Sequence, residues 1–139
     1  GTLALADALQ RTGAGADIAH LILGLLGDNP NPSLLILTIL LLSCLLTNFM
    51  SNTATAALLA PIGLSIAGSL TADPRAVLMA VVIGSSCAFA TPIGTPANTM
   101  ILSVGHYRFI DYTKVGLPLI AITIIVSMIL LPIFFPFFP

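Results

Sequence analysis

The residues of this chain that are best suited to bind ions form two short polar clusters. Residues 47–55 read Thr-Asn-Phe-Met-Ser-Asn-Thr-Ala-Thr, and residues 91–99 read Thr-Pro-Ile-Gly-Thr-Pro-Ala-Asn-Thr. Hydroxyl and amide groups can donate hydrogen bonds to an anion, and their oxygens can coordinate Na⁺. Each cluster is therefore a candidate ion-binding site that contains no charged side chain.

The same residue types also have a purely structural use, because Ser and Thr in membrane helices commonly hydrogen-bond the backbone one turn earlier. We expect that use for isolated residues such as Thr38 and Thr123. The clusters differ, since an Asn left without a partner in hydrocarbon costs on the order of a few kcal/mol. Ion binding is therefore the favoured interpretation of the two clusters.

Both clusters lie in long stretches of sequence without charge. The chain has 139 residues, of which 58% are hydrophobic and only 6% are charged, whereas soluble domains carry about 25% charged residues. Asp, Glu, Lys and Arg are absent from residues 29–72, from 76–105 and after Lys114. Each neutral block reaches the roughly 20 residues that span a bilayer. We therefore predict an integral membrane protein with at least three membrane-embedded blocks and the lipid bilayer as its surroundings.

Composition also excludes several classes of function. Nucleic-acid binding needs a basic surface, and the chain has only four basic residues. An intramembrane enzyme would need an acid, a metal-binding His pair or an activated nucleophile, and the neutral blocks contain no Asp, Glu, His, Lys or Arg. We expect neither an enzyme nor an organic cofactor, and we interpret Cys44 and Cys87 as buried packing residues.

Prolines, glycines and charges divide the chain into four segments. Residues 1–32 are expected to form short amphipathic, interfacial helices and a turn, with Ser33 as N-cap of the next helix. Residues 33–72 are expected to form a re-entrant helical hairpin with a Ser-Asn-Thr tip, although a fully spanning hairpin stays open. Residues 73–105 are expected to form a discontinuous transmembrane helix that resumes at Met100. Residues 106–139 are expected to form a wet loop, from about 105 to 114, and a final transmembrane helix over 115–138.

The two clusters resemble motifs of a known family. Residues 47–55 resemble the second Ser-Asn-Thr hairpin motif of the divalent anion:sodium symporters, which include dicarboxylate, citrate and sulfate carriers. Residues 86–98, Ser-Cys-Ala-Phe-Ala-Thr-Pro-Ile-Gly-Thr-Pro-Ala-Asn, are similar to the broken helix that follows in that family. The resemblance extends from about Leu34 to the C-terminus with the motifs in the same order.

This resemblance implies an all-α polytopic membrane protein of the elevator type, with inverted repeats and a homodimeric assembly. It implies that the substrate carboxylate or sulfate contacts Asn52, Thr53, Thr95 and Pro96, and the chemistry of the clusters adds Ser51 and Asn98 as substrate-binding candidates. It also implies that one Na⁺, the coupling ion, is bound by Thr47, Met50, Asn52 and Gly94, with Met50 and Gly94 providing main-chain carbonyls.

Two departures from the family pattern affect this interpretation. Many members have an acidic residue where this sequence has Asn48. The sequence also resembles only the second repeat, so the N-terminal repeat, with its own Ser-Asn-Thr hairpin and sodium site, is missing. We therefore expect that this chain alone does not transport.

The expected function is Na⁺-coupled symport of small divalent anions, either di- or tricarboxylates or sulfate, in the bacterial inner membrane. The family topology would place residues 105–114 in the cytoplasm, which agrees weakly with the positive-inside rule. Two alternatives stay open. One is a transporter of the wider ion-transporter group that carries arsenite or exchanges Na⁺ for protons, and the other is a structural membrane subunit.

Overall fold

The computed structural model describes residues 4, 8, 11–27 and 31–138. All regular structure in this part of the chain is helical, as predicted. The helices are α2 (Ala14–Leu26), α3 (Pro32–Thr47), α4 (Asn52–Ser69), α5 (Pro74–Ser85), α6 (Pro96–Val104) and α7 (Phe109–Phe134). Of the short helices predicted before residue 32, α2 is described, and most of the predicted first one lies outside the described residues.

Three helices begin earlier than predicted, because capping residues and prolines set their first turns. The N-cap of α3 is Asn31, whose side chain accepts a hydrogen bond from the Ser33 N–H at 3.0 Å, so the prediction of Ser33 as N-cap is wrong. Pro32 takes the first helical position, where its missing N–H costs nothing. In the same way α6 begins at Pro96 and not at Met100.

The loop before α7 is shorter than predicted. The Asp111 carboxylate accepts a hydrogen bond from the Arg108 N–H at 2.8 Å, which starts the helix at Phe109. An acidic residue in the first turn also interacts favourably with the helix dipole. The predicted final helix over 115–138 therefore begins six residues earlier and includes Lys114, while its helical part ends at Phe134.

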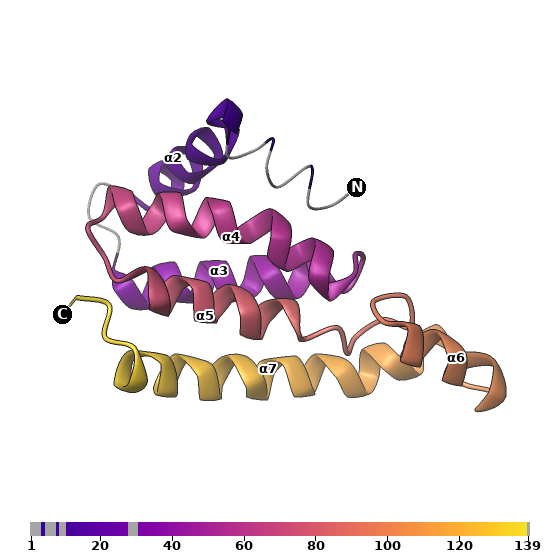
Figure 1. The fold of residues 1–139 in the computed structure, drawn as a ribbon. Coiled ribbons are helices and arrows are strands. Elements are labelled where there is room, and N and C mark those ends of the chain that lie inside the picture. Colours follow the sequence, from indigo (N-terminus) through magenta and orange to yellow (C-terminus); the bar gives the residue numbers. More distant parts are fainter. Residues whose placement is uncertain (1–3, 5–7, 9–10, 28–30, 139) are drawn as a thin grey trace.

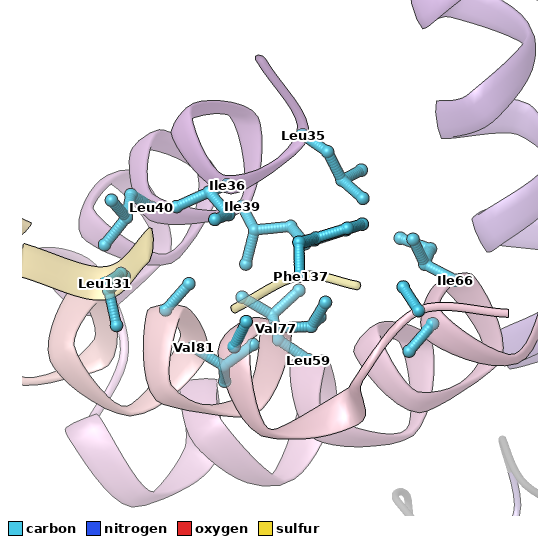
Figure 2. Close-up of a cluster of buried hydrophobic side chains, with 14 of the residues drawn as sticks. Leu35, Ile36, Ile39, Leu40, Leu59, Ile66, Val77, Val81, Leu131 and Phe137 are labelled. Carbon is cyan, nitrogen blue, oxygen red and sulfur yellow. The ribbon is translucent and has the colours of Figure 1, made fainter. Parts of the chain in front are cut away.

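Helices α3, α4, α5 and α7 pack along one another, and α5 contacts the other three (Figure 1). Their buried faces form one apolar cluster, which the chain after α7 completes with Phe137 (Figure 2). The Phe137 carbonyl also accepts a hydrogen bond from the Asp73 N–H at 2.9 Å, which joins this segment to the start of α5. The largest fully buried side chains of the cluster are those of Leu35, Ile36, Leu40, Ile66, Val77 and Val81.

Helices α3 and α5 approach each other closely at Gly84. A Cβ atom at this position would lie 2.5 Å from the Ser43 Cβ and 3.0 Å from the Leu40 carbonyl oxygen. Small residues at such a crossing let two helix backbones come together, as is common in membrane proteins. The close crossing places the end of α5 beside the end of α3.

The outer helix α7 differs from the inner ones. Its 26 residues make it the helix in the described part of the chain that is long and apolar enough to cross a membrane, whereas α3 and α5 are apolar but shorter. Most of its large side chains are exposed. Its buried residues form a narrow stripe made of Gly116, Ile120, Ser127 and Leu131.

Candidate functional site

The two polar clusters lie at the same end of the helix bundle. Residues 48–51 connect α3 to α4, and residues 86–95 connect α5 to α6 (Figure 1). We call these segments the hairpin tip and the break. A helix begins at the end of each segment, so two helix N-termini with unpaired backbone N–H groups lie at this end of the molecule. Such N-termini favour bound anions.

The N-cap residues of these two helices are both predicted site residues. The Ser51 hydroxyl accepts a hydrogen bond from the Ala54 N–H at 3.1 Å at the start of α4. The Thr95 hydroxyl accepts one from the Asn98 N–H at 3.4 Å at the start of α6. Each cap satisfies one N–H of its first helical turn, so the remaining N–H groups of that turn are available to a ligand.

Two of the four predicted sodium ligands, Thr47 and Asn52, meet where α3 ends. The fully buried Thr47 hydroxyl lies 2.7 Å from the Asn52 Oδ1 and also within hydrogen-bond distance of the Ser85 carbonyl oxygen. A hydroxyl has one hydrogen, so it can donate to only one of these two acceptors at a time. This group therefore has more oxygen acceptors than hydrogen-bond donors, and such a surplus of oxygen lone pairs suits a cation.

Gly94 brings the break against the main chain of Thr47. A Cβ atom at Gly94 would lie 2.9 Å from the Thr47 carbonyl oxygen and 2.8 Å from the Ala88 Cβ. Only a residue without a side chain allows this approach. Met50, the fourth predicted ligand, is half-buried in the hairpin tip, and its N–H donates to the Leu46 carbonyl at 2.9 Å.

The predicted substrate-binding residues surround the two helix starts, with different degrees of exposure. Ser51, Thr53 and Pro96 are exposed, whereas Asn52, Thr95 and Asn98 are half-buried. The Asn98 amide donates to the Ala88 carbonyl at 3.0 Å and to the Thr91 carbonyl at 3.2 Å. Both of its donors therefore hold the break in shape, and contact between these six residues and an anion stays a prediction.

Side chains from outside the break satisfy much of its backbone. The Thr99 hydroxyl donates to the Pro92 carbonyl at 2.7 Å, and the Thr113 hydroxyl of α7 donates to the Ala90 carbonyl at 3.0 Å. Next to the break, the Tyr112 hydroxyl of α7 donates to the Asn98 carbonyl in the first turn of α6 at 2.9 Å. Non-helical backbone at membrane depth needs such partners, and the break has them.

Two residues at this site carry roles that the sequence did not indicate. The Ser85 carbonyl oxygen joins the Thr47 and Asn52 oxygens, but a main-chain group leaves no signal in the sequence. In the sequence, Asn48 stands out only as a departure from a family pattern. Its side chain is buried, with 6% exposure, and it bonds to both α3 and the break.

Any cation held here would be bound by neutral oxygens. No group of three or more His, Cys, Asp or Glu side chains that could hold a metal ion occurs within the described ranges. Hard cations such as Na⁺ accept hydroxyl, amide and carbonyl oxygens, so the chemistry of the donors fits an alkali cation and not a transition metal.

Comparison with known proteins assigns the chain to a family. The citrate transporter family matches residues 1–138, so the chain belongs to that family. The match covers both polar clusters and all the described helices. The family is one of transporters, and together with the long apolar helix α7 it indicates an integral membrane protein.

Individual relatives agree with this assignment. The chain is 37% identical over 139 residues to an uncharacterized transporter, YfbS, of Escherichia coli (strain K12), covering 99% of this chain and 22% of the relative. It is 33% identical over 129 residues to the sodium-dependent low-affinity dicarboxylate transporter 1 of Caenorhabditis elegans, covering 93% of this chain and 22% of the relative. It is 40% identical over 81 residues to the Na⁺/citrate cotransporter of Mus musculus, covering 56% of this chain and 14% of the relative.

The resemblance to the divalent anion:sodium symporters is thereby confirmed. The chain spans less than a quarter of the length of these relatives: 22% of the Escherichia coli and nematode proteins and 14% of the mouse protein.

Proposed function

We propose that this chain is the C-terminal part of a Na⁺-coupled symporter for small divalent anions, with di- or tricarboxylates as the first candidates. The observation that carries the proposal is the meeting of the Thr47, Asn52 and Ser85 oxygens and Gly94 beside two helix N-termini. The names of the nematode and mouse relatives support the choice of carboxylates and of sodium.

The proposed order of binding is sodium first and anion second. Na⁺ would be coordinated by the Thr47 hydroxyl, the Asn52 amide oxygen and the carbonyls of Met50 and Gly94, and its charge would draw the hairpin tip and the break together. The anion would then bind to the N-termini of α4 and α6 and to the side chains of Asn52, Thr53 and Thr95. Because no basic side chain lies in either cluster, Na⁺ supplies the positive charge that the anion needs.

The lengths of the hairpin helices support a re-entrant position in the membrane. Helix α3 has 16 residues and α4 has 18, which at 1.5 Å per residue is about 24 and 27 Å. Both are shorter than the ~30 Å of a hydrocarbon core. We therefore keep the division into residues 1–32, a re-entrant hairpin over 33–72, a discontinuous helix over 73–105 and a final span over 106–139.

The complete transporter would contain parts that this chain lacks. The proposal includes an N-terminal repeat with a second hairpin, a homodimer and a location in the bacterial inner membrane. The chain covers 22% of the length of the Escherichia coli and nematode relatives, which leaves room for that repeat. Sulfate as substrate, and the arsenite or Na⁺/H⁺ exchange alternatives, remain to be separated by experiment.

Uptake by the parent full-length transporter in proteoliposomes tests the proposal. Labelled citrate, succinate and sulfate are supplied in Na⁺ and in choline, with each unlabelled anion as competitor. We expect uptake of one anion class in Na⁺ and none in choline. No Na⁺-dependent uptake of any of the three, by protein that is correctly folded, would contradict the proposal and favour the arsenite or antiporter alternative.

Substitutions at the two helix starts connect this activity to the site. We expect Asn52→Ala and Thr95→Ala each to reduce Na⁺-dependent uptake at least about tenfold, which corresponds to about 1.4 kcal/mol. Thr38→Ala is the matched control, because the Thr38 hydroxyl donates only to the Leu34 carbonyl of its own helix at 2.8 Å. A structural membrane subunit would tolerate all three changes equally.

A further inference from the structure

Asn48 occupies the point where the end of α3 meets the break. We infer that Asn48 is a positioning residue that joins the hairpin tip to the break through its neutral amide and thereby sets the sodium site. This inference rests on the proposed function, because the site that it positions is the proposed cation site. Asn48 itself is not proposed as a ligand of either ion.

The hydrogen bonds of Asn48 use every polar group of its side chain. Its Nδ2 donates to the Cys44 carbonyl of α3 at 2.6 Å and to the Cys87 carbonyl of the break at 3.2 Å. Its Oδ1 accepts from the Ala90 N–H at 2.9 Å. Its own carbonyl accepts a short hydrogen bond from the Thr91 hydroxyl. One residue of the hairpin tip thus holds three residues of the break.

The position of this joint relates it directly to the sodium-ligand candidates. Thr47 precedes Asn48 in the chain, and its carbonyl oxygen is the atom that a Cβ at Gly94 would meet at 2.9 Å. If the Asn48 joint opened, the break would be free to move away from Thr47 and Asn52. The distance between Gly94 and the other ligands therefore depends on the Asn48 amide.

The chemistry of the joint requires an amide and not a carboxylate. Both Nδ2 hydrogens point to carbonyl oxygens, and a carboxylate in their place would have no donor and would put a negative charge beside two acceptors. At a buried position the charged form is disfavoured further. Only the protonated carboxyl can donate to one of these carbonyls, so Asn48→Asp should convert a joint that is independent of pH into one that needs acid.

The titratable groups near this joint are few. Cys44 and Cys87, whose carbonyls accept from Asn48, also carry thiols, and the first turns of α7 carry Asp111, Tyr112 and Lys114. Helices α3, α4 and α6 contain no Asp, Glu, His, Lys or Arg, and the single such residue of α5, Arg75, lies at the opposite end of that helix. All these groups are present in the unmodified protein as well, so its own pH profile measures their effect.

The test compares Na⁺-dependent uptake by the parent transporter and its Asn48→Asp variant from pH 5 to 8, with equal pH on both sides of the membrane. Rates are expressed relative to the unmodified protein at each pH. A sulfate arm is included where the protein carries sulfate, because the charge of sulfate is constant over this range. Burial raises the pKa of a carboxyl at this position, so we expect the relative rate of Asn48→Asp to fall at least about tenfold from pH 5 to 8 as the proton is lost.

Three further variants make the result specific. Asn31→Asp is the matched control, since Asn31 is an exposed N-cap at the other end of α3, where Asp caps equally well, and its relative rate should not change with pH. Asn48→Leu should be impaired equally at every pH. Thr91→Val removes only the bond to the Asn48 carbonyl, and it should raise the half-saturating Na⁺ concentration several-fold, which covers the case in which Asn48→Asp does not fold.

The outcomes separate this inference from the proposed function. If the unmodified protein shows no Na⁺-dependent uptake, the proposed function fails. If it transports, a relative rate of Asn48→Asp that is constant from pH 5 to 8 overturns the inference. When Asn48→Asp yields no folded protein, an unchanged sodium dependence of Thr91→Val overturns it instead.

Discussion

The hairpin tip and the break both interrupt helices at the same end of the molecule, but they satisfy their backbone in different ways. The hairpin tip has four residues, and the N–H groups of Phe49 and Met50 donate back to the Leu46 carbonyl within the same turn. The break has ten residues, and side chains from Asn48 of the hairpin tip, from α6 and from α7 hold its carbonyls and N–H groups.

This difference indicates which part of the site depends on contacts with the rest of the fold. The hairpin tip is made from local bonds, so its shape should survive changes elsewhere in the molecule. The break is shaped by contacts across the fold, so small changes at Asn48, Gly94 or Thr113 should alter it. We therefore expect the break to be the more sensitive half of the site.

The largest effect is expected from Gly94→Ala. Its Cβ would lie within 3 Å of the Thr47 carbonyl and the Ala88 Cβ, so the break must move away from the sodium-ligand candidates. We expect Na⁺-dependent uptake to fall by about tenfold or more, or at least about 1.4 kcal/mol. The measurement is uptake against Na⁺ concentration. Gly68→Ala in α4 is the control, since nothing lies within 4 Å of its added Cβ, and equal loss in both variants would contradict the close-approach argument.

A smaller and more specific effect is expected from Thr47→Val. The two side chains have similar shapes, so the substitution removes the hydroxyl oxygen while filling the same buried space. We expect the half-saturating Na⁺ concentration to rise several-fold, with little change in the anion KM at saturating Na⁺. Thr38→Val serves as control for loss of a helix hydroxyl. An altered anion KM with unchanged sodium dependence would place Thr47 outside the cation site.

The smallest effect is expected from Thr113→Val on α7. It removes the hydrogen bond to the Ala90 carbonyl of the break, and one such bond contributes about 0.5–1.5 kcal/mol. We expect a modest decrease in the thermal stability of the parent protein in detergent. The Thr38 hydroxyl of α3 donates to the Leu34 carbonyl of its own helix at 2.8 Å, so Thr38→Val should change stability less. A larger loss of thermal stability in the control variant than in Thr113→Val would mean that α7 does not support the break.

The sequence predicted the helical class and the places where helices are interrupted, because proline, glycine and polar clusters act locally. Residues 47–55 contain the end of α3 and the start of α4, and residues 91–99 contain the start of α6, whereas α5 already ends at Ser85. The exact helix starts were less predictable, since Asn31 and Ser33 are both good N-caps and only the packed chain selects one.

The tertiary bonds of the site could not be predicted from the residues alone. The part played by the Ser85 carbonyl depends on where α5 ends relative to α3, which the crossing at Gly84 determines. Asn48 and Asn98 are the same residue type in similar polar clusters, yet their bonds differ. Asn48 joins the hairpin tip to the break, whereas Asn98, in the first turn of α6, bonds back to the break that precedes it in the chain. Three-dimensional packing assigns these roles.

The narrow buried stripe of α7 has a consequence for how this helix wraps around its neighbours. Gly116 and Ser127 are eleven positions apart, and so are Ile120 and Leu131. Eleven residues make three helical turns at about 3.67 residues per turn, slightly more than the 3.6 of a straight α-helix. A heptad repeat, with 3.5 residues per turn, gives a left-handed supercoil, whereas contacts that repeat every eleven residues give a right-handed one. We therefore expect α7 to coil around the bundle with a slight right-handed twist.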